Sequence, residues 1–460
     1  MRINRAIAEL LRVDAAALSN PEGVAVLAGN TVPENAATIA QAYAGHQFGG
    51  FVPSLGDGRA ILLGEVIGQD GVRYDVQLKG SGRTPFSRNG DGRAGLGPVL
   101  REYIVSEGMA ALGVPSTRAL AAVTTGEIVE REYPLPGAVL TRVAQSHIRV
   151  GTFQYFAARG DIEAIRQLAD YAIERHDADL APLPAPARYN AMLERIIERQ
   201  ASLIARWLSL GFIHGVMNTD NMAISGETID YGPCAFMDTF HPGKVFSSID
   251  RGGRYAWGNQ PRIGQWNLSR LAETLLPLFS DDETLAQKIA QAAIDRYAGL
   301  FSVALTREMR AKLGLASEEA DDLALAQELL SALAEGEADF TLFFHHLADL
   351  AADPGAQVPN GLLVRTEAFD RWRASWHARL DRDALDPSVR AAAMRRVNPA
   401  IIPRNHRVEE ALEAANTGDY APFEALLEAV THPFEPPEAL RPYMAPPRPE
   451  QVVRQTFCGT

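Results

Sequence analysis

The stretch that decides the fold is His214-Gly-Val-Met-Asn-Thr-Asp-Asn221, followed by Met222-Ala-Ile-Ser-Gly-Glu-Thr-Ile-Asp-Tyr-Gly232. The Ser225-Gly226 turn predicts a short hairpin with Asn221 and Asp230 at its two ends. Pairing of its strands would bring the side-chain oxygens of Asn221 and Asp230 together, and such hard ligands suit Mg²⁺. Asp220 could accept a proton from an attacking hydroxyl group. The alternative is that these residues only form turns; two aspartates and an asparagine around one hairpin favour the functional interpretation.

A lysine and a glutamate upstream indicate a phosphate-binding site. Lys79 ends an alternating strand pattern, and Glu102 lies on the helix predicted next, which resembles the lysine–glutamate pair of protein kinases. A surface lysine and a solvated glutamate are the alternative. Glycines alternate with cations between these residues, which is typical of an anion-binding loop. The cations are Lys79, Arg83, Arg88, Arg93 and Arg101, with Asp91 the single acid, and the glycines are Gly80, Gly82, Gly90, Gly92, Gly95 and Gly97.

Two smaller groups of residues could contribute to the same site. Gly56-Asp57-Gly58-Arg59 precedes a strand, and its glycines would let the backbone approach a phosphate closely. Taken alone, this pattern is more often a simple turn. Arg142 and Arg149 follow an apolar strand and could add positive charge, although two surface arginines are an equally good interpretation.

The order of the predicted elements indicates an α+β fold, protein-kinase-like and two-lobed. Strands are predicted at 59–66, 73–79, 120–125 and 138–143, with a helix at 99–112. A long helix ends at Gly211, and most of 266–427 has amphipathic helical patterns. We expect an N-lobe at 1–150, a helical C-lobe at 151–380 and a helical extension at 381–460 that packs behind the C-lobe. The seven prolines of 433–449 predict an extended surface segment.

Composition excludes several classes of function. The 460 residues are 47% hydrophobic and 22% charged, which is typical of a globular protein. A formal net charge of -13 makes nucleic acid an unsuitable partner. No apolar run reaches the roughly 18–20 residues that span a bilayer, and the first residues lack a secretory signal. With two cysteines, Cys234 and Cys458, the chain fits a reducing compartment, and we expect a cytoplasmic protein.

The chain departs from protein kinases at one point. Counted from His214, the position of the usual catalytic base falls on Val216, whereas the metal-binding asparagine falls on Asn221. The metal site is therefore kept and the usual base is missing, which disfavours an ordinary phosphotransferase.

These residues resemble the selenoprotein O family, also called YdiU-like proteins, whose kinase-like members transfer AMP. The matching stretches occur in the family's order and are unusual. We expect the resemblance to run from about residue 36 to the C-terminus, after a leading segment shorter than in typical members. The stretches are Tyr43-Ala-Gly-His-Gln-Phe-Gly49, Leu55-Gly-Asp-Gly-Arg59, Gln77-Leu-Lys-Gly80, Gly90-Asp-Gly-Arg93, His214 through Met222, Asp230-Tyr-Gly-Pro233 and Val397-Asn-Pro-Ala400.

The resemblance implies that AMP moves from ATP to Ser, Thr or Tyr hydroxyl groups of protein substrates and that pyrophosphate leaves. The nucleotide would be bound in the reverse sense from a kinase, with the α-phosphate facing the acceptor. Glu102 would orient Lys79, Asp220 would be the base, and Asn221 and Asp230 would hold Mg²⁺ or Mn²⁺. The residues implied to bind ATP are Gly56, Gly58, Arg59, Lys79, Asp91, Gly92, Arg142, Arg149 and Asp230.

The resemblance also draws attention to the cysteines. Some members carry selenocysteine third from the C-terminus, and here that position is Cys458. A disulfide between Cys458 and Cys234 would tie the tail across the active-site loop and give redox control. A buried, inert Cys234 is an equally good interpretation.

Three other functions stay open. One is an ordinary phosphotransferase with Asp220 replacing the displaced base, and another is transfer of UMP with Mn²⁺ in the same pocket. The third is a catalytically silent pseudokinase that acts as a scaffold, which the presence of Lys79, Asn221 and Asp230 disfavours.

Overall fold

An antiparallel sheet organises the N-terminal part of the chain. The computed structural model describes residues 1–457, and its six-stranded sheet has the order β1-β7-β8-β5-β4, with β6 beside β8. Gln77 pairs with Arg142 across β5 and β8, and residues two apart on a strand share a face, so Lys79 and Arg142 lie on one face. The strands are β1 (Arg2–Ile3), β4 (Ala60–Ile67), β5 (Arg73–Lys79), β6 (Ala94–Gly95), β7 (Arg118–Glu130) and β8 (Pro134–Ala144).

Helices cover both faces of this sheet. Helix α4 (Leu96–Ala111) buries Leu100 against Ala122 and Leu140 on one face. On the other face Ile7 packs against Leu120 and Val143. The helices on that second face are α1 (Arg5–Leu10), α2 (Ala15–Ser19) and α3 (Pro21–Leu27). Apolar side chains on both faces explain why β7 and β8 are almost continuously hydrophobic.

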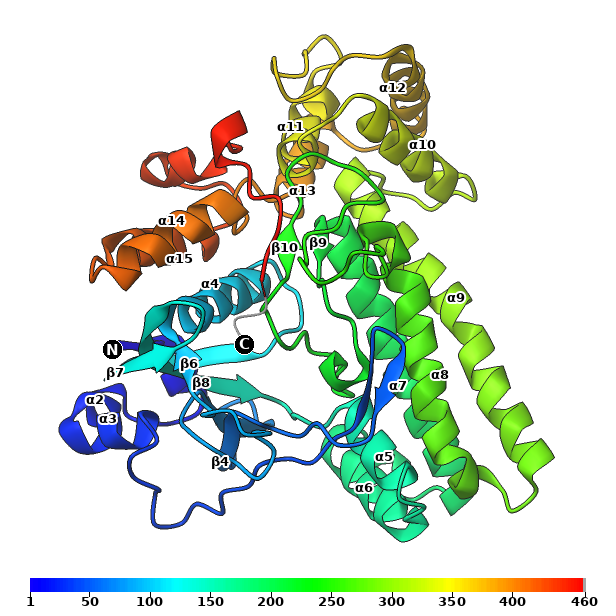
Figure 1. Cartoon of the computed structure of the whole chain (residues 1–460). Coiled ribbons are helices and arrows are strands. Elements are labelled where there is room, and N and C mark those ends of the chain that lie inside the picture. The colour runs from blue at the N-terminus through cyan, green and yellow to red at the C-terminus, as the bar shows by residue number, and fades with distance from the viewer. Residues whose placement is uncertain (458–460) are drawn as a thin grey trace.

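The C-terminal helices lie elsewhere than we expected. Instead of packing behind the predicted C-lobe, α14 (Asn405–Asn416) and α15 (Ala421–Val430) share a hydrophobic core with α4, and Figure 1 shows them beside that helix. The approach is close, because a Cβ added at Gly108 of α4 would lie 2.9 Å from Pro403 and 3.4 Å from Val430. These helices therefore complete the N-terminal core.

The remainder of the chain is helical and forms two further cores. In Figure 1, α7, α8 and α9 run side by side at the right, and α10 to α12 lie above them. The helices are α5 (Val150–Ala157), α6 (Ile162–His176), α7 (Ala185–Ser209), α8 (Gln260–Phe279), α9 (Glu283–Leu313), α10 (Asp322–Glu335), α11 (Phe340–Ala352), α12 (Glu367–Leu380) and α13 (Pro387–Arg395). Within residues 1–457, no helix is long and apolar enough to cross a membrane.

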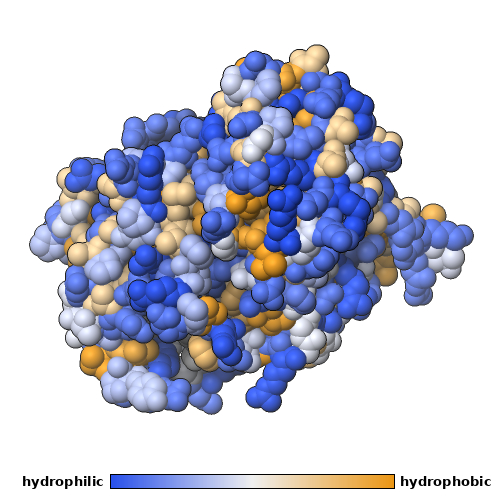
Figure 2. Space-filling view, turned by 90° about the horizontal axis from the view of Figure 1, so that it is seen from above, coloured by the Kyte–Doolittle hydropathy of each residue, from blue (hydrophilic) through white to orange (hydrophobic). Residues whose placement is uncertain are grey.

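The sequence predicted the type of most elements, and the structure corrects several details. The strand at 73–79 is confirmed, and the helix expected at 99–112 begins earlier, at Leu96. The tail at 433–449 is not simply extended, because 438–444 forms a 3-10 helix. Figure 2 shows one face of the folded chain, on which hydrophilic side chains dominate and hydrophobic ones form a patch near the middle.

The hairpin predicted between Asn221 and Asp230 is also wrong. The turn exists, with the Gly226 amide donating to the Ala223 carbonyl. The strands on its two sides, however, pair with other segments of the chain and not with each other. Ala223 forms a β-bridge with Arg149, and Thr228 forms one with Ser116. A two-stranded hairpin alone is marginally stable, so its strands gain more from partners in the rest of the fold.

Candidate active site

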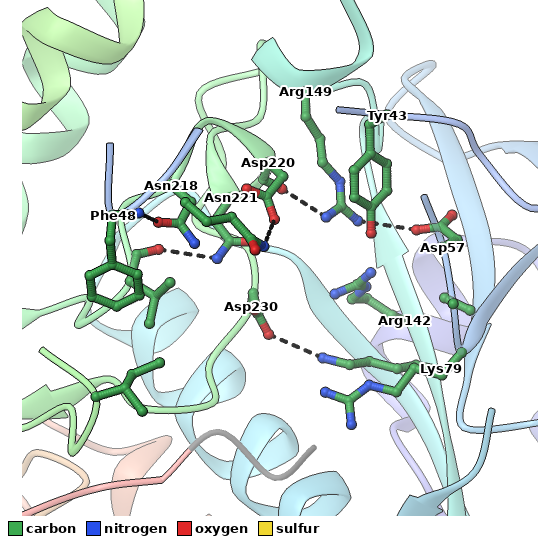
Figure 3. Close-up of a pocket in the computed structure, with 16 residues that line it drawn as sticks. Tyr43, Phe48, Asp57, Lys79, Arg142, Arg149, Asn218, Asp220, Asn221 and Asp230 are labelled. Carbon is green, nitrogen blue, oxygen red and sulfur yellow. Dashed lines mark hydrogen bonds and ion pairs between the residues drawn. The ribbon is translucent and has the colours of Figure 1, made fainter. Parts of the chain in front are cut away.

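A cavity of about 270 Å³ lies between the sheet and the loops around residues 216–230. Figure 3 shows charged side chains converging on it from both sides. We call the side formed by Lys79, Arg142 and Arg149 the cation wall, and the side formed by Asp220, Asn221 and Asp230 the oxygen wall. The predicted residues that line this cavity are Gly58, Arg59, Lys79, Arg142, Arg149, Asp220, Asn221 and Asp230.

Glu102 fixes two cations of the cation wall. This α4 carboxylate is 4% exposed and accepts hydrogen bonds from Lys79 and, at 3.2 Å, from Arg142. Burial disfavours its ionised form, but the charges of Lys79 and Arg142 outweigh burial and lower the pKa of Glu102. Arg142 also donates to the Gln77 side-chain oxygen at 2.5 Å. The predicted lysine–glutamate pair is therefore present in the structure.

Arg149, just before α5, joins the two walls. Its guanidinium donates to the Asp220 backbone carbonyl at 2.8 Å and lies 3.5 Å from the Asp57 carboxylate. The same group lies over the Tyr43 ring, 4.4 Å from its centre. Sequence reasoning gave no role to Asp57 or Tyr43, although both lie in stretches that it singled out. The signal for Asp57 was available, since an acid between two glycines beside several arginines needs a partner.

Asp220 and Asn221 lie in the 3-10 turn Thr219–Asn221. One carboxylate oxygen of Asp220 accepts a hydrogen bond from the Gln47 side-chain amide at 3.3 Å. The other is buried and has no hydrogen-bond partner among residues 1–457. Burial raises the pKa of Asp220 to about 6, against the opposing charge of Arg149. The Asn221 amide donates to the Val216 carbonyl at 3.1 Å, which leaves its side-chain oxygen available to a ligand.

Asp230 occupies an unusual backbone conformation, with φ at 68°. Such an angle is uncommon outside glycine, and it is often found where a side chain must be held in a functional position. Burial opposes ionisation of Asp230, but the charges of Lys79 and Arg59 outweigh burial and hold its pKa below the ordinary value. Lys79 lies 3.3 Å from the Asp230 carboxylate, so the two walls meet at this contact.

A small hairpin, β2 (Gly45–Gln47) and β3 (Gly50–Val52), holds the oxygen wall in place. The His46 amide donates to the Thr219 hydroxyl at 2.7 Å, and the Phe48 amide donates to the Asn218 side chain at 3.1 Å. Contact is so close that a Cβ on Gly45 would lie 2.6 Å from an Asp220 carboxylate oxygen. Sequence reasoning quoted this stretch but assigned no role to it.

The remaining predicted residues lie in an adjoining cavity of about 490 Å³. Gly56, Asp91 and Gly92 line it, and it shares Tyr43, Gly58 and Arg59 with the first cavity. Asp91 is paired with Arg131 at 2.8 Å, and this hydrogen bond lowers the pKa of Asp91 to about 2. The predicted set therefore spans two neighbouring cavities, with Glu102 behind the cation wall.

Cys234 is a buried thiol in the described chain, and burial raises its pKa to about 12. The other cysteine of the predicted disulfide, Cys458, lies outside the described residues. The tail does pass close to this loop, since the Thr456 hydroxyl donates to the Pro233 carbonyl at 2.5 Å and Thr456 bridges to Ser247. The pairing of the two cysteines stays a prediction.

The oxygens of the oxygen wall are too few to bind a metal ion alone and would need further oxygens from a bound nucleotide. Within residues 1–457, no three His, Cys, Asp or Glu side chains cluster so as to hold a metal ion. Asn221 and Asp230 line the same cavity and supply hard oxygens. Mg²⁺ is commonly bound by one or two protein groups plus phosphate oxygens, so this pair fits it when a nucleotide is present.

Comparison with known proteins identifies the family of this chain. The family model described as "Protein adenylyltransferase SelO" matches residues 1–431, so the resemblance begins earlier than the expected residue 36. A protein nucleotidyltransferase YdiU from Rhodopseudomonas palustris (strain ATCC BAA-98 / CGA009) is 58% identical over 463 residues, which cover 100% of this chain and 94% of that protein. A relative with the same name from Bradyrhizobium sp. (strain ORS 278) is 59% identical over 461 residues, with the same coverage. The chain thus belongs to the SelO family of protein adenylyltransferases.

Proposed function

We propose that this protein nucleotidyltransferase transfers AMP from ATP to hydroxyl groups of proteins, on a kinase-like two-lobed frame. The observation that carries the proposal is the cavity in which three cations face two carboxylates and an amide. A reaction that expels pyrophosphate develops negative charge on the leaving group, and preorganised cations stabilise it. The three residues of the cation wall supply that charge, together with Arg59, which lines the same cavity.

The two adjoining cavities support a reversed nucleotide. The glycine-rich cavity is the larger one and would receive the adenosine portion beside Gly56, Asp91 and Gly92. The phosphates would then enter the smaller cavity with the β- and γ-phosphates toward the cation wall. This direction leaves the α-phosphate at the oxygen wall, where an acceptor can reach it.

Asp220 is suited to serve as the general base. Its free carboxylate oxygen is buried in the cavity wall, and hydrogen bonds from the hairpin and Arg149 hold the loop that carries it. It would accept the proton of the acceptor hydroxyl as that oxygen attacks the α-phosphate. Asn221 and Asp230 would hold Mg²⁺, which when bound would neutralise phosphate charge.

The experiment that tests this function uses ATP labelled on the α- or the γ-phosphate, with Mg²⁺ and the purified protein. We expect covalent label from the α-position only, on this chain or on added proteins, and loss of label with Asp230→Ala. Label from the γ-position only would show an ordinary phosphotransferase and overturn the proposal.

The same assay separates the remaining alternatives. Preferred labelling from α-labelled UTP with Mn²⁺ would show UMP transfer instead. An absence of label from every nucleotide would favour a silent scaffold, and nucleotide binding measured in parallel would show whether the pocket is intact.

A further inference from the structure

A strip of aromatic and cationic side chains extends outward from the mouth of the smaller cavity. We define this rim strip as Phe48, Phe51, Arg254, Arg262, Trp266 and Arg270. Phe48 lines the cavity and is 37% exposed, and Phe51, on the same hairpin, is 44% exposed. In Figure 3, Phe48 lies on the opposite side of the cavity from Lys79. The strip therefore begins on the oxygen wall's side.

Contacts between side chains link Phe51, Trp266, Arg254 and Arg270, with the ring of His46 between Phe51 and Trp266. The rings of His46 and Phe51 lie 4.9 Å apart, and those of His46 and Trp266 lie 5.2 Å apart. The guanidinium groups of Arg254 and Arg270 lie 4.8 Å and 5.1 Å from the Trp266 ring centre. Residues 262, 266 and 270 of α8 are spaced by four, so they share one face of the helix.

The charge of this region is opposite to that of the whole protein. The chain has 44 Lys and Arg against 57 Asp and Glu. Residues 239–272 nevertheless contain five cations and a single acid, Asp250, which is 5% exposed and caps the backbone amides of Arg254 and Tyr255. One of these cations, Arg270, is paired at 2.5 Å with Glu273, the next acid along α8. Neither Arg254 nor Arg262 forms an ion pair within the described chain, so both charges are available to a partner. The cations are Lys244, Arg251, Arg254, Arg262 and Arg270.

We propose that the rim strip binds an acidic segment of the acceptor protein that also carries an apolar side chain near the modified hydroxyl group. This inference rests on the proposed function, because it concerns the acceptor of the same reaction. Carboxylates would pair with Arg254 and Arg262, and an apolar side chain would cover Phe51. Opposite charges across an interface steer encounter and set specificity. The strip lies outside the two nucleotide cavities except at Phe48.

The test measures binding first, so that it does not depend on transfer. A fluorescent peptide with a tyrosine flanked by Asp, Glu and Leu is compared with one in which Asn and Gln replace the acids. We expect the acidic peptide to bind more tightly to the wild-type protein. Because it removes two exposed ion pairs with the peptide, the Arg254→Gln, Arg262→Gln double variant should weaken that binding roughly tenfold.

A matched control removes the same charge far from the strip. Arg365, just before α12, and Arg371, on α12, are 64% and 72% exposed in their side chains, and the Arg365→Gln, Arg371→Gln double variant should leave peptide binding unchanged. ATP affinity should stay the same in both double variants. Phe51→Ser should weaken binding of the peptide with Leu and not of one with Ser in its place.

Each other outcome has a definite meaning. Equal binding of the two peptides by the wild-type protein, or equal loss in both double variants, overturns the docking proposal. Tighter binding of a single-stranded oligonucleotide than of the acidic peptide would show that the strip receives nucleic acid. Peptide preference without any α-label on protein would instead contradict the proposed function and leave the docking surface standing.

Discussion

The two walls of the smaller cavity are held in place by different means. On the cation wall each charged group has a charged partner: Glu102 binds Lys79 and Arg142, and Asp57 faces Arg149. On the oxygen wall the backbone of the β2–β3 hairpin holds the loop, and one Asp220 oxygen has no partner within residues 1–457.

This difference follows from what each wall would do. Cations that stabilise a leaving group must be in position before the reaction, and ion pairs preorganise them. Two cations share the single charge of Glu102, and one of them, Lys79, also faces Asp230 of the oxygen wall. Oxygens that accept a proton or hold a metal must instead keep lone pairs free. The oxygen wall should therefore be sensitive to displacement and the cation wall to charge.

Among the substitutions that test the two walls, Asp220→Asn should have the largest effect on the rate of AMP transfer. A general base contributes about 10²- to 10⁴-fold, so the single-turnover rate of AMP transfer should fall within that range. ATP affinity should be kept, because Arg149 contacts the Asp220 backbone and not its side chain. Transfer from α-labelled ATP and nucleotide binding measure the two quantities separately. A rate within tenfold of wild type would remove Asp220 from the role of base.

Gly45→Ala tests displacement without a change of charge. Its Cβ would lie 2.6 Å from the Asp220 carboxylate, so that side chain must move. A misplacement of about 1 Å can cost about 100-fold in rate, and we expect a loss of that order in kcat with an unchanged melting temperature. Gly50→Ala in the same hairpin is the control, because the nearest atom to its Cβ would be the Gln47 carbonyl at 3.5 Å. Equal losses in both variants would argue for a general defect of the hairpin.

Glu102→Gln tests charge without a change of size. Lys79 and Arg142 would lose the carboxylate that holds them in position, and we expect the KM for ATP to rise about tenfold, or roughly 1.4 kcal/mol. Removing one partner of a buried ion pair also lowers the free energy of unfolding, by about 3–5 kcal/mol in the strongest cases. Steady-state kinetics and denaturant unfolding measure these effects.

The control for this variant is Glu409→Gln. Glu409 pairs with Arg101 of the same helix α4 at 3.4 Å, but its side chain is 44% exposed. Exposed pairs contribute about 0–1 kcal/mol, so stability and KM should hardly change. Unchanged kinetics in Glu102→Gln as well would mean that the cation wall does not depend on this carboxylate.

The positions of Lys79 and Glu102 were easier to predict from sequence than the position of Asp220. Lys79 ends a strand of period two and Glu102 lies on a regular helix, so local patterns place both. The position of Asp220 depends on Gly45 and His46, more than 170 residues earlier. No local pattern reports a contact at that separation.

The failed predictions share the same cause. The strands on the two sides of the Ser225-Gly226 turn were expected to pair with each other, and instead Ala223 pairs with Arg149 and Thr228 pairs with Ser116. Likewise the amphipathic pattern of α14 and α15 shows that each helix buries one face. It does not show that the partner is α4 rather than a neighbouring helix. Local sequence gives the type of an element, and the choice of partner is set by the fold as a whole.

A buried carboxylate that lies on neither wall gives the smallest expected effect on transfer. Glu227 accepts hydrogen bonds from the backbone N–H of Gln145 at 2.9 Å and from the Ser225 hydroxyl at 3.0 Å. Burial raises its pKa from 4.5 to about 7. Between these two values the folded chain keeps a proton that the unfolded chain has lost. The contribution of Glu227 to the free energy of unfolding therefore has its full value below pH 4.5 and decreases as the pH rises toward 7.

Glu227→Gln should remove that pH dependence. One pKa unit corresponds to about 1.4 kcal/mol, so at pH above 7 the variant should be more stable than wild type by roughly 1–3 kcal/mol. Near pH 4.5 the two should be alike, because wild-type Glu227 is then mostly protonated in the folded chain. Denaturant unfolding across this range, with the exposed Glu174 changed to Gln as control, measures the difference. A variant less stable than wild type at high pH would mean that Glu227 is ionised in the folded chain. Its hydrogen-bond donors would then stabilise the carboxylate, as Lys79 and Arg142 stabilise that of Glu102.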